Sequence, residues 1–432
     1  MLPNRSHIGR VEPFAEMTSS MTITAFSTAT NPARNQARVL WVACGAHALH
    51  DGFTDTLYVL LPLWQAQFAL SYAAIGILRA LYAGVMAGLQ VPFAGAVRWV
   101  SGATILAAGT AAAAAAYLFL GASSSIAMLA IALVLGGIGS STQHPIASSL
   151  VAAAYEGPRS RGALGTYNFA GDLGKMALPA LTAGLIAVMS WHSAASIIGM
   201  IGLVGAAAIM LLLRSGTMER TARVPAIQPD TGEVRDRTGL LGNGFPLLLA
   251  IGVIDSATRM GFLTFLPFLL RAKGAGVPEI GVALTLLFAG GAAGKLVCGF
   301  LGARLGVLPT VLLTEGATAA GILALLPLPY GAALALLPVI GMALNGTSSV
   351  LYGTVPDLVT VQQRERAFGV FYTGTIGAGA LSPALYGLFG DAIGLTPAML
   401  LVAMVVLLTL PLAWPLTRLL HRTREERFAD PK

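Results

Sequence analysis

Twelve apolar stretches, each long enough to form a helix across a lipid bilayer, dominate the 432-residue chain. A bilayer core requires about 20 consecutive apolar residues per helix. Only 10% of the residues are charged, against about 25% in a soluble protein, so most of the surface must face lipid. The sequence therefore predicts an all-α membrane protein and excludes a soluble enzyme, a disordered scaffold and a disulfide-stapled domain. The predicted spans are 39–66, 71–97, 102–121, 125–153, 162–189, 193–213, 245–270, 278–303, 307–328, 331–356, 366–390 and 395–416.

A polar stretch separates these spans into two groups of six. It contains five arginines, two prolines and several glycines, a composition typical of a flexible linker. The predicted organisation is a disordered cytoplasmic tail at 1–37, a first six-helix half at 38–213, a cytoplasmic linker at 214–243, a second six-helix half at 244–416 and a cytoplasmic tail at 417–432.

Basic residues outside the spans predict the orientation of the chain in the membrane. Twenty Lys and Arg residues lie in the tails, the linker and one set of loops, whereas the alternate loops hold only Arg271 and Lys273. Both termini are therefore predicted to be cytoplasmic, in a multi-pass protein of the inner membrane. This distribution also accounts for the net charge of +7, so we expect a lipid bilayer as the partner and no nucleic acid. We expect a monomer.

The second half repeats the first at a fixed offset of 204 residues. This shift pairs Asp51 with Asp255 and Pro179 with Pro383, each within corresponding spans. Two repeated six-helix halves joined by a cytoplasmic linker resemble the major facilitator superfamily. The resemblance implies pseudo-two-fold symmetry and a substrate cavity between the halves near mid-membrane. It also implies alternating access, in which one half rocks against the other.

The superfamily's signature loop after the second span is only partly present. The first copy keeps Gly95 and Gly102 but has Trp99 in the position of the signature Asp, and the second copy has Ala303 there. The loss of both acids argues against the usual cytoplasmic gate pairing, so the rocking mechanism requires another gate contact in its place.

Two motifs of the first half point to a narrower group. The segment 137–145, GIGSSTQHP, is similar to G-x-G-S-S-x-x-H-P, a motif of the fosmidomycin-resistance branch of the superfamily. That branch also carries H-x-x-N-D and P-x-x-Q in its first span, and here His50 replaces the Asn. The resemblance implies proton-driven export of small polar or drug-like compounds, and hence drug resistance. The first-span matches are His47, Asp51, Pro62 and Gln65.

Nine acidic and basic side chains lie in the interior of the predicted spans, away from their ends, where each costs at least about 2.5–3.5 kcal/mol on insertion scales. The excess of one acid over the bases allows mutual pairing and leaves room for one proton. The acids are Asp51, Asp55, Asp172, Asp255 and Glu315, and the bases are Arg79, Lys175, Arg259 and Lys295.

The first span carries the candidates for proton coupling. His47, Asp51 and Asp55 recur at helical spacing, and His50 lies close to their stripe. Two carboxylates one turn apart in a low dielectric resist ionising together, so one of them is expected to hold a proton that His47 or His50 relays. The alternative is a permanent Asp–His pair that only fixes helix packing. A metal site from His47, His50 and Asp51 would lack a fourth ligand, so we expect no metal.

Cationic side chains are the candidates for binding a solute. Arg259 follows Asp255 by one turn and either pairs with it or clamps an anion with its planar guanidinium. Lys175 and Asp172 likewise form an internal pair or bind solute, and Lys295 needs a partner from another helix or from the solute. Glu315 is expected to be structural or interfacial. The remaining candidates are Arg79, Gln143, His144, Tyr167, Asn168, Asn345 and Tyr372.

Three functions follow from these residues. The first is a proton antiporter that exports a small anionic or zwitterionic solute or drug. The second is a proton symporter that imports a small carboxylate. The third, from another class, is a membrane sensor or enzyme that uses the His–Asp cluster, but no nucleophile set or catalytic domain accompanies that cluster. We therefore expect no enzymatic activity and no cofactor, and because no P-loop motif occurs, ATP is not the energy source.

Overall fold

The computed structural model describes residues 32–155, 157–213, 244–360 and 363–429, and helices without any strand make up their regular secondary structure. The predicted all-α fold is confirmed. Helix α1 begins at Pro32, within the stretch predicted as a tail. Residues 1–31 and the whole predicted linker, 214–243, lie outside the described residues.

The helices divide between the two halves of the chain. In the first half they are α1 (Pro32–Phe68), α2 (Tyr72–Ala96), α3 (Gly102–Gly121), α4 (Ile126–Ser140), α5 (Gln143–Ala154), α6 (Pro158–Ile186) and α7 (Trp191–Leu213). In the second half they are α9 (Phe245–Ala272), α10 (Val277–Leu305), α11 (Val307–Leu325), α12 (Tyr330–Leu358), α13 (Arg364–Ile393), α14 (Leu395–Val406) and α15 (Thr409–Ala429).

Two of the predicted spans are each broken into two helices. Proline cannot donate to the carbonyl four residues before it and clashes with that carbonyl. Pro145 explains the break at Ser141, between α4 and α5, and Pro411 explains the break at Leu407, between α14 and α15. Helix α15 continues to Ala429, through the stretch predicted as the C-terminal tail.

Ten helical stretches among the described residues are long and apolar enough to cross a membrane. Helices α1 and α6 are equally long but do not meet that criterion. Both carry charged residues in their interior, Asp51 and Asp55 in α1 and Asp172 and Lys175 in α6. These two helices thus hold half of the candidate site residues.

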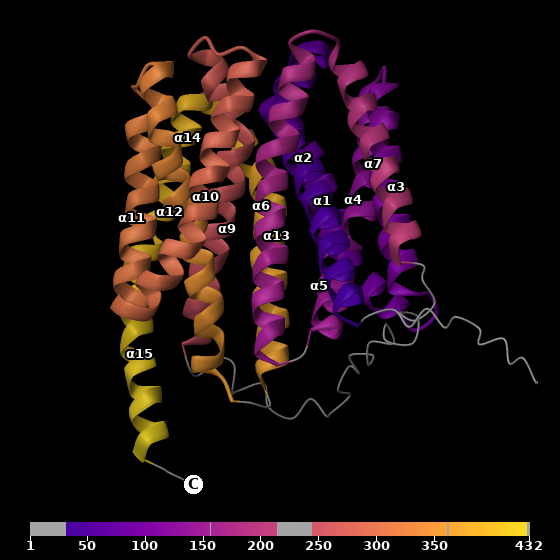
Figure 1. The fold of residues 1–432 in the computed structure, drawn as a ribbon. Helices are drawn as coiled ribbons and strands as arrows, with labels where there is room; N and C mark the ends of the chain where they lie inside the picture. The colour runs from indigo at the N-terminus through magenta and orange to yellow at the C-terminus, as the bar shows by residue number, and fades with distance from the viewer. Residues whose placement is uncertain (1–31, 156, 214–243, 361–362, 430–432) are drawn as a thin grey trace, which may run out of the picture.

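The two halves stand side by side, with α6 and α13 at the boundary between them (Figure 1). Helix α2 of the first half packs along α13 of the second, and α6 packs along α10. The α2–α13 contact depends on Gly76, because a Cβ atom there would lie 2.2 Å from the carbonyl oxygen of Pro383. These two helix pairs form most of the interface between the halves.

The hydrophobic core is continuous at one end of the bundle and divided at the other. We call the end where α1 begins and α15 ends the terminal end, at the bottom of Figure 1, and the opposite end the far end. At the far end a single cluster joins Trp64 of α1 to Phe265 of α9. At the terminal end the first half has its own cluster around Ile146, and the second half has a separate one around Phe371. The halves are therefore closed against each other at the far end and apart at the terminal end.

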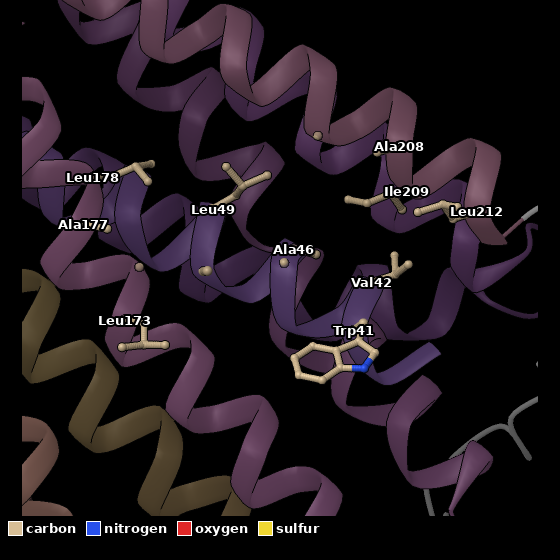
Figure 2. A pocket seen from close by; sticks show the side chains of 14 residues that line it. Trp41, Val42, Ala46, Leu49, Leu173, Ala177, Leu178, Ala208, Ile209 and Leu212 are labelled. Atoms are coloured by element: carbon tan, nitrogen blue, oxygen red, sulfur yellow. The ribbon is translucent and has the colours of Figure 1, made fainter. Parts of the chain in front are cut away.

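An apolar groove of about 490 Å³ lies between α1, α6 and α7 (Figure 2). Its lining has no charged side chain, and 68% of Trp41 at its edge is exposed. Figure 2 shows Trp41, Leu173 and Leu212 around this groove. Such a surface is suited to lipid contact, so the groove is not the candidate site.

Candidate functional site

A cavity of about 670 Å³ lies between the two halves and is lined by polar and charged side chains. Gln90, Ser148 and Leu164 extend its lining toward the terminal end, which agrees with the divided core there. Of the predicted site residues, twelve line the cavity: Asp51, Asp55, Arg79, His144, Tyr167, Asn168, Asp172, Lys175, Arg259, Lys295, Asn345 and Tyr372. The other four, His47, His50, Gln143 and Asp255, lie behind its wall.

An ion-pair chain of Asp51, Lys175, Asp172 and Lys295 crosses the cavity from α1 to α10. The Lys175 ammonium lies 3.3 Å from Asp51 Oδ2 and 3.7 Å from Asp172 Oδ1. Lys295 Nζ donates to Asp172 Oδ1 at 2.5 Å and so joins the second half to the first. Of the alternatives that the sequence left open, the structure contains a partner for Lys295 on another helix and a pair between Asp172 and Lys175.

His47 supports Asp51 from behind. Its Nδ1 lies 2.9 Å from the carbonyl oxygen of Tyr167, and its ring stacks on the Tyr167 ring with centroids 4.1 Å apart. Its other nitrogen, Nε2, lies 3.3 Å from Asp51 Oδ2. Close packing is required here, since a Cβ atom at Gly171 would be 2.7 Å from both Asp51 and His47. Gln143 completes this wall by donating to the Tyr167 hydroxyl at 3.3 Å.

These contacts require a proton between His47 and Asp51. A backbone carbonyl can only accept, so Nδ1 carries the hydrogen that binds Tyr167. In neutral His47 the Nε2 atom would then present a lone pair to a carboxylate oxygen, which is repulsive. The 3.3 Å contact is favourable only when a proton resides on Nε2 or on the Asp51 carboxyl.

His50 does not reach the cavity. Its Nε2 lies 2.9 Å from the Thr110 hydroxyl, which donates its own hydrogen to the carbonyl of Leu106. His50 therefore donates from Nε2 toward α3, and its Nδ1 is buried without a partner. His50 directly precedes Asp51 in α1, and adjacent residues of a helix point about 100° apart, so His50 faces α3 while Asp51 lines the cavity.

His144, rather than His50, meets His47 and Asp51. Its Nε2 lies 3.8 Å from Asp51 Oδ1, and its ring lies edge-on to that of His47. One ligand atom each from His47, Asp51 and His144 falls within a 4.8 Å group, so these residues are the possible metal ligands among the described part of the chain. The Lys175 ammonium, 3.3 Å from Asp51, already provides the positive charge at that position.

Arg79 lies in an aromatic cradle on the far-end side of the cavity. It donates from Nη2 to the Tyr58 hydroxyl at 3.1 Å, and its guanidinium lies 5.0 Å from the Tyr58 ring centre and 5.6 Å from that of Tyr82. Its Nε and Nη1 atoms are buried without a hydrogen-bond partner. Asp55, one turn before Tyr58, contributes to the electrostatic field at Arg79, but the structure contains no direct ion pair between these two residues.

Arg259 faces the same cavity from the second half. Its Nε is also buried without a hydrogen-bond partner. Of the two alternatives for Arg259, the ion pair with Asp255 is not formed in the described part of the chain, although the Arg259 charge acts on the buried Asp255 carboxyl. Both cavity guanidinium groups, Arg79 and Arg259, thus have N–H groups that no protein atom satisfies.

Glu315, which the sequence suggests is structural or interfacial, is 1% exposed and lies inside the second half, away from the lining of the cavity. Its Oε1 atom is buried without a hydrogen-bond partner. The offset of 204 places residue 111, an alanine, in the equivalent position, so the repeat does not predict this buried carboxyl.

Comparison with known proteins agrees with this architecture. A sequence model of the Major Facilitator Superfamily matches residues 43–251 and 248–431. No curated protein sequence matches the chain. Two crystal structures of a bacterial homologue of the human lysosomal transporter Spinster are similar in fold. The inward-facing, unoccupied form has a TM-score of 0.72 and 17% identity, and the match covers 90% of this chain and 98% of that one. The inward-facing, occupied form has a TM-score of 0.71 and 18% identity, with 91% and 99% covered.

Proposed function

The chain belongs to the Major Facilitator Superfamily, and from this premise we propose that it is a proton-coupled secondary transporter of a small anionic or zwitterionic solute. In this proposal the cavity between the halves binds the solute and opens to each side of the membrane in turn. The excess of basic residues in the predicted cytoplasmic loops and tails supports a cytoplasmic position for the terminal end. The cavity then faces the cytoplasm in this structure.

The His47–Asp51 contact is the single observation that carries the proposal of proton coupling. Because Nδ1 of His47 is committed to the Tyr167 carbonyl, the Nε2–Asp51 contact forms and breaks with one proton. Loss of that proton leaves the Asp51 carboxylate to Lys175 and so alters the ion-pair chain that joins the halves. A proton at this position can therefore influence how the halves meet.

The guanidinium groups of Arg79 and Arg259 support an anionic group on the solute. Each has at least one buried N–H without a protein partner, and a buried unsatisfied donor costs roughly 1–3 kcal/mol. A carboxylate or phosphonate that accepts from these groups removes that cost. The two arginines come from opposite halves, so an anion between them contacts both halves at once.

Two directions of transport have support. The resemblance of the first half to the fosmidomycin-resistance branch favours export in exchange for protons. Charge balance favours the second candidate, import of a small carboxylate with a proton. Acids and bases alternate along the ion-pair chain. A solute anion that pairs with one of the lysines therefore leaves an aspartate without its partner, and that aspartate can then accept a proton. Uptake of both together keeps the buried charge constant.

A solute screen followed by a flux measurement tests the proposal. A library of small carboxylates, phosphonates and zwitterions is screened by thermal shift at two pH values, and the best hit is used in liposomes with a pH-sensitive dye. We expect solute-driven proton movement in the wild type and none above background in Asp51→Asn. The matched control is Glu279→Gln, an exposed acid-to-amide change at the far end of α10, which should move protons like the wild type. Undiminished proton movement in Asp51→Asn would contradict the assignment.

The same liposomes decide the direction. An inside-acidic gradient drives an anion outward if the protein is a symporter and inward if it is an antiporter. The same question can be asked in cells. An exporter should give an expression host resistance to toxic compounds, whereas an importer should allow growth on the hit as sole carbon source.

A further inference from the structure

We propose that Asp391 of the second half holds the far end of the molecule closed by capping α2 of the first half, and that this cap breaks whenever the far end opens. We call the Asp391 carboxylate and the backbone N–H groups of Tyr72 and Ala73 the far-end cap. Of the proposed function, the inference needs only that the halves open the cavity to each side in turn. Asp391 is exposed near the end of α13, one residue beyond the predicted span 366–390.

Both carboxylate oxygens of Asp391 accept hydrogen bonds from the start of α2. Oδ1 accepts from the backbone N–H of Tyr72 at 2.7 Å, and Oδ2 accepts from that of Ala73 at 2.9 Å. The next N–H group, of Ala74, donates to the side chain of Ser71, the N-cap residue of α2 itself. The first N–H groups of a helix have no partner within it and form the positive end of its dipole. A side chain of the second half thus completes the cap of a helix in the first half, with two charge-assisted bonds.

Tyr72 is docked into the second half by its backbone and by its ring. A Cβ atom at Gly387, one turn before Asp391, would lie 2.3 Å from the Tyr72 carbonyl oxygen, so the two helices approach here as closely as glycine permits. The Tyr72 ring lies edge-on to Phe265 and Phe268 of α9, with centroids 5.9 and 5.7 Å away. The cap therefore forms where the fit between the halves is tight, and a carboxylate there cannot follow α2 when α2 moves away.

The contact related to this one by the internal repeat has no such carboxylate. Helices α6 and α10 correspond to α13 and α2 under the offset of 204 residues, and they also pack along each other. The offset places Ala187, the C-cap of α6, at the position equivalent to Asp391. The first turn of α10 instead carries an acid of its own, Glu279. Packing of two such helices thus does not require a carboxylate from the opposite half, which favours a conformational role for Asp391.

Opening of the far end must break the far-end cap. When α2 leaves α13, the N–H groups of Tyr72 and Ala73 and the Asp391 carboxylate all exchange their bonds for bonds to water. Arg271 also joins the halves at this end, but through a bond to one neutral acceptor, the Pro62 carbonyl, at 3.2 Å. Two bonds from a charged acceptor to a helix N-terminus favour the closed far end more strongly. The charge of Asp391 therefore biases the molecule toward the conformation that is open at the terminal end.

Pulsed EPR distance measurements in liposomes, without any solute, test the inference. Spin labels are attached at Ser124 and Ala332, which are exposed at the far end in opposite halves, in a background without the two native cysteines. Asp391→Asn keeps the shape but loses the charge, and Asp391→Ala removes both acceptors. We expect the ratio of the longer to the shorter distance population to rise about tenfold in Asp391→Ala and by less in Asp391→Asn.

Glu279→Gln is the matched control, because it changes an exposed acid to an amide at the same end. Its carboxylate lies close to the start of its own helix, where a Cβ atom at Gly276 would be 2.6 Å from Glu279 Oε2. This variant should show the distances of the parent protein. A second label pair at Ala66 and Ser124, both at the far end of the first half, should show one unchanged distance in every variant.

Two results would overturn the inference. One is an unchanged Ser124–Ala332 distribution in both Asp391 variants, which would show that the cap does not bias the halves. The other is a change in the Ala66–Ser124 distance, which would show that Asp391 only keeps the first half folded. Failure of the flux experiment with Asp51→Asn leaves these distances unaffected, so the two proposals fail separately.

Discussion

Lys295 of α10 and Asp172 of α6 lie 2.5 Å apart and form the ion pair that links the two halves within the cavity. Asp172 also lies 3.7 Å from Lys175, which lies 3.3 Å from Asp51. A change in the charge of Asp51 therefore reaches the second half through two lysines. A proton at the His47–Asp51 contact can therefore influence the interface between the halves through this chain of ion pairs.

The Lys295–Asp172 pair predicts non-additive effects on stability. Asp172→Asn leaves Lys295 without its partner and Lys295→Gln leaves Asp172 with the longer contact to Lys175 alone, whereas the double variant removes both charges. We expect the double variant to lose less thermal stability than the sum of the singles, with a coupling of about 1 kcal/mol because partial exposure weakens such pairs. The melting temperatures of the four proteins measure it. Additive losses would show that the two side chains do not interact.

We predict that a small side chain at Gly76 changes the conformation of the far end. A Cβ atom at this position would lie 2.2 Å from the Pro383 carbonyl oxygen, so Gly76→Ala should separate α2 from α13 at the far end. We expect a shift toward conformations open at that end. Spin labels at Ala66 and Glu279, in a background without Cys44 and Cys298, measure it as a longer distance population.

Gly84→Ala is the matched control on the same helix, since nothing lies within 4 Å of a Cβ atom there. Its distance distribution should equal that of the parent protein. An equal distribution for Gly76→Ala would contradict the proposal that the α2–α13 contact keeps the far end closed.

Features that lie along one helix can be predicted from the sequence more readily than contacts between helices. The apolar spans, the proline before which α4 breaks and the charges in α1 and α6 follow from local pattern. Lys295 was expected to find a partner elsewhere because none lies within a turn of it. The identity of that partner, Asp172, depends on how α6 and α10 pack against each other, which no local pattern specifies.

Spacing within one helix predicts some contacts and not others. His47 meets Asp51 and Asp172 meets Lys175 within one turn, whereas His50 hydrogen-bonds to Thr110 of α3 and does not line the cavity. Thr110 is visible in the sequence only as a polar residue within an apolar span.

We predict that anion binding at Arg79 requires the shape of the guanidinium group and not only its positive charge. Arg79→Lys keeps the positive charge but loses the planar guanidinium that donates to Tyr58 and lies near the rings of Tyr58 and Tyr82. We expect the affinity for the solute found by the screen to fall at least about tenfold, which is roughly 1.4 kcal/mol. Isothermal titration calorimetry measures this change.

Arg271→Lys is the control for Arg79→Lys, because Arg271 lies at the far end and donates to the Pro62 carbonyl outside the cavity. Its affinity should match that of the wild type. Equal affinity in Arg79→Lys would mean that the anionic group does not reach this guanidinium, and the same substitution at Arg259 would then identify which arginine binds it.

We predict that His47→Phe abolishes proton coupling and leaves solute exchange intact. Phenylalanine keeps the ring that stacks on Tyr167 but has neither the Nδ1 contact to the Tyr167 carbonyl nor the Nε2 contact to Asp51. Solute–solute counterflow needs no net proton movement, so we expect the variant to retain it. Accumulation of solute driven by a pH gradient should fall to the level of protein-free liposomes. Both rates are measured with the same labelled solute in the same preparation.

The control is His192→Phe at the far end, where the ring contacts Trp191 and the Ser123 carbonyl. This variant should retain both activities. A His47→Phe protein that still accumulates solute would place the coupling proton elsewhere, and loss of counterflow as well would assign His47 to solute binding or packing.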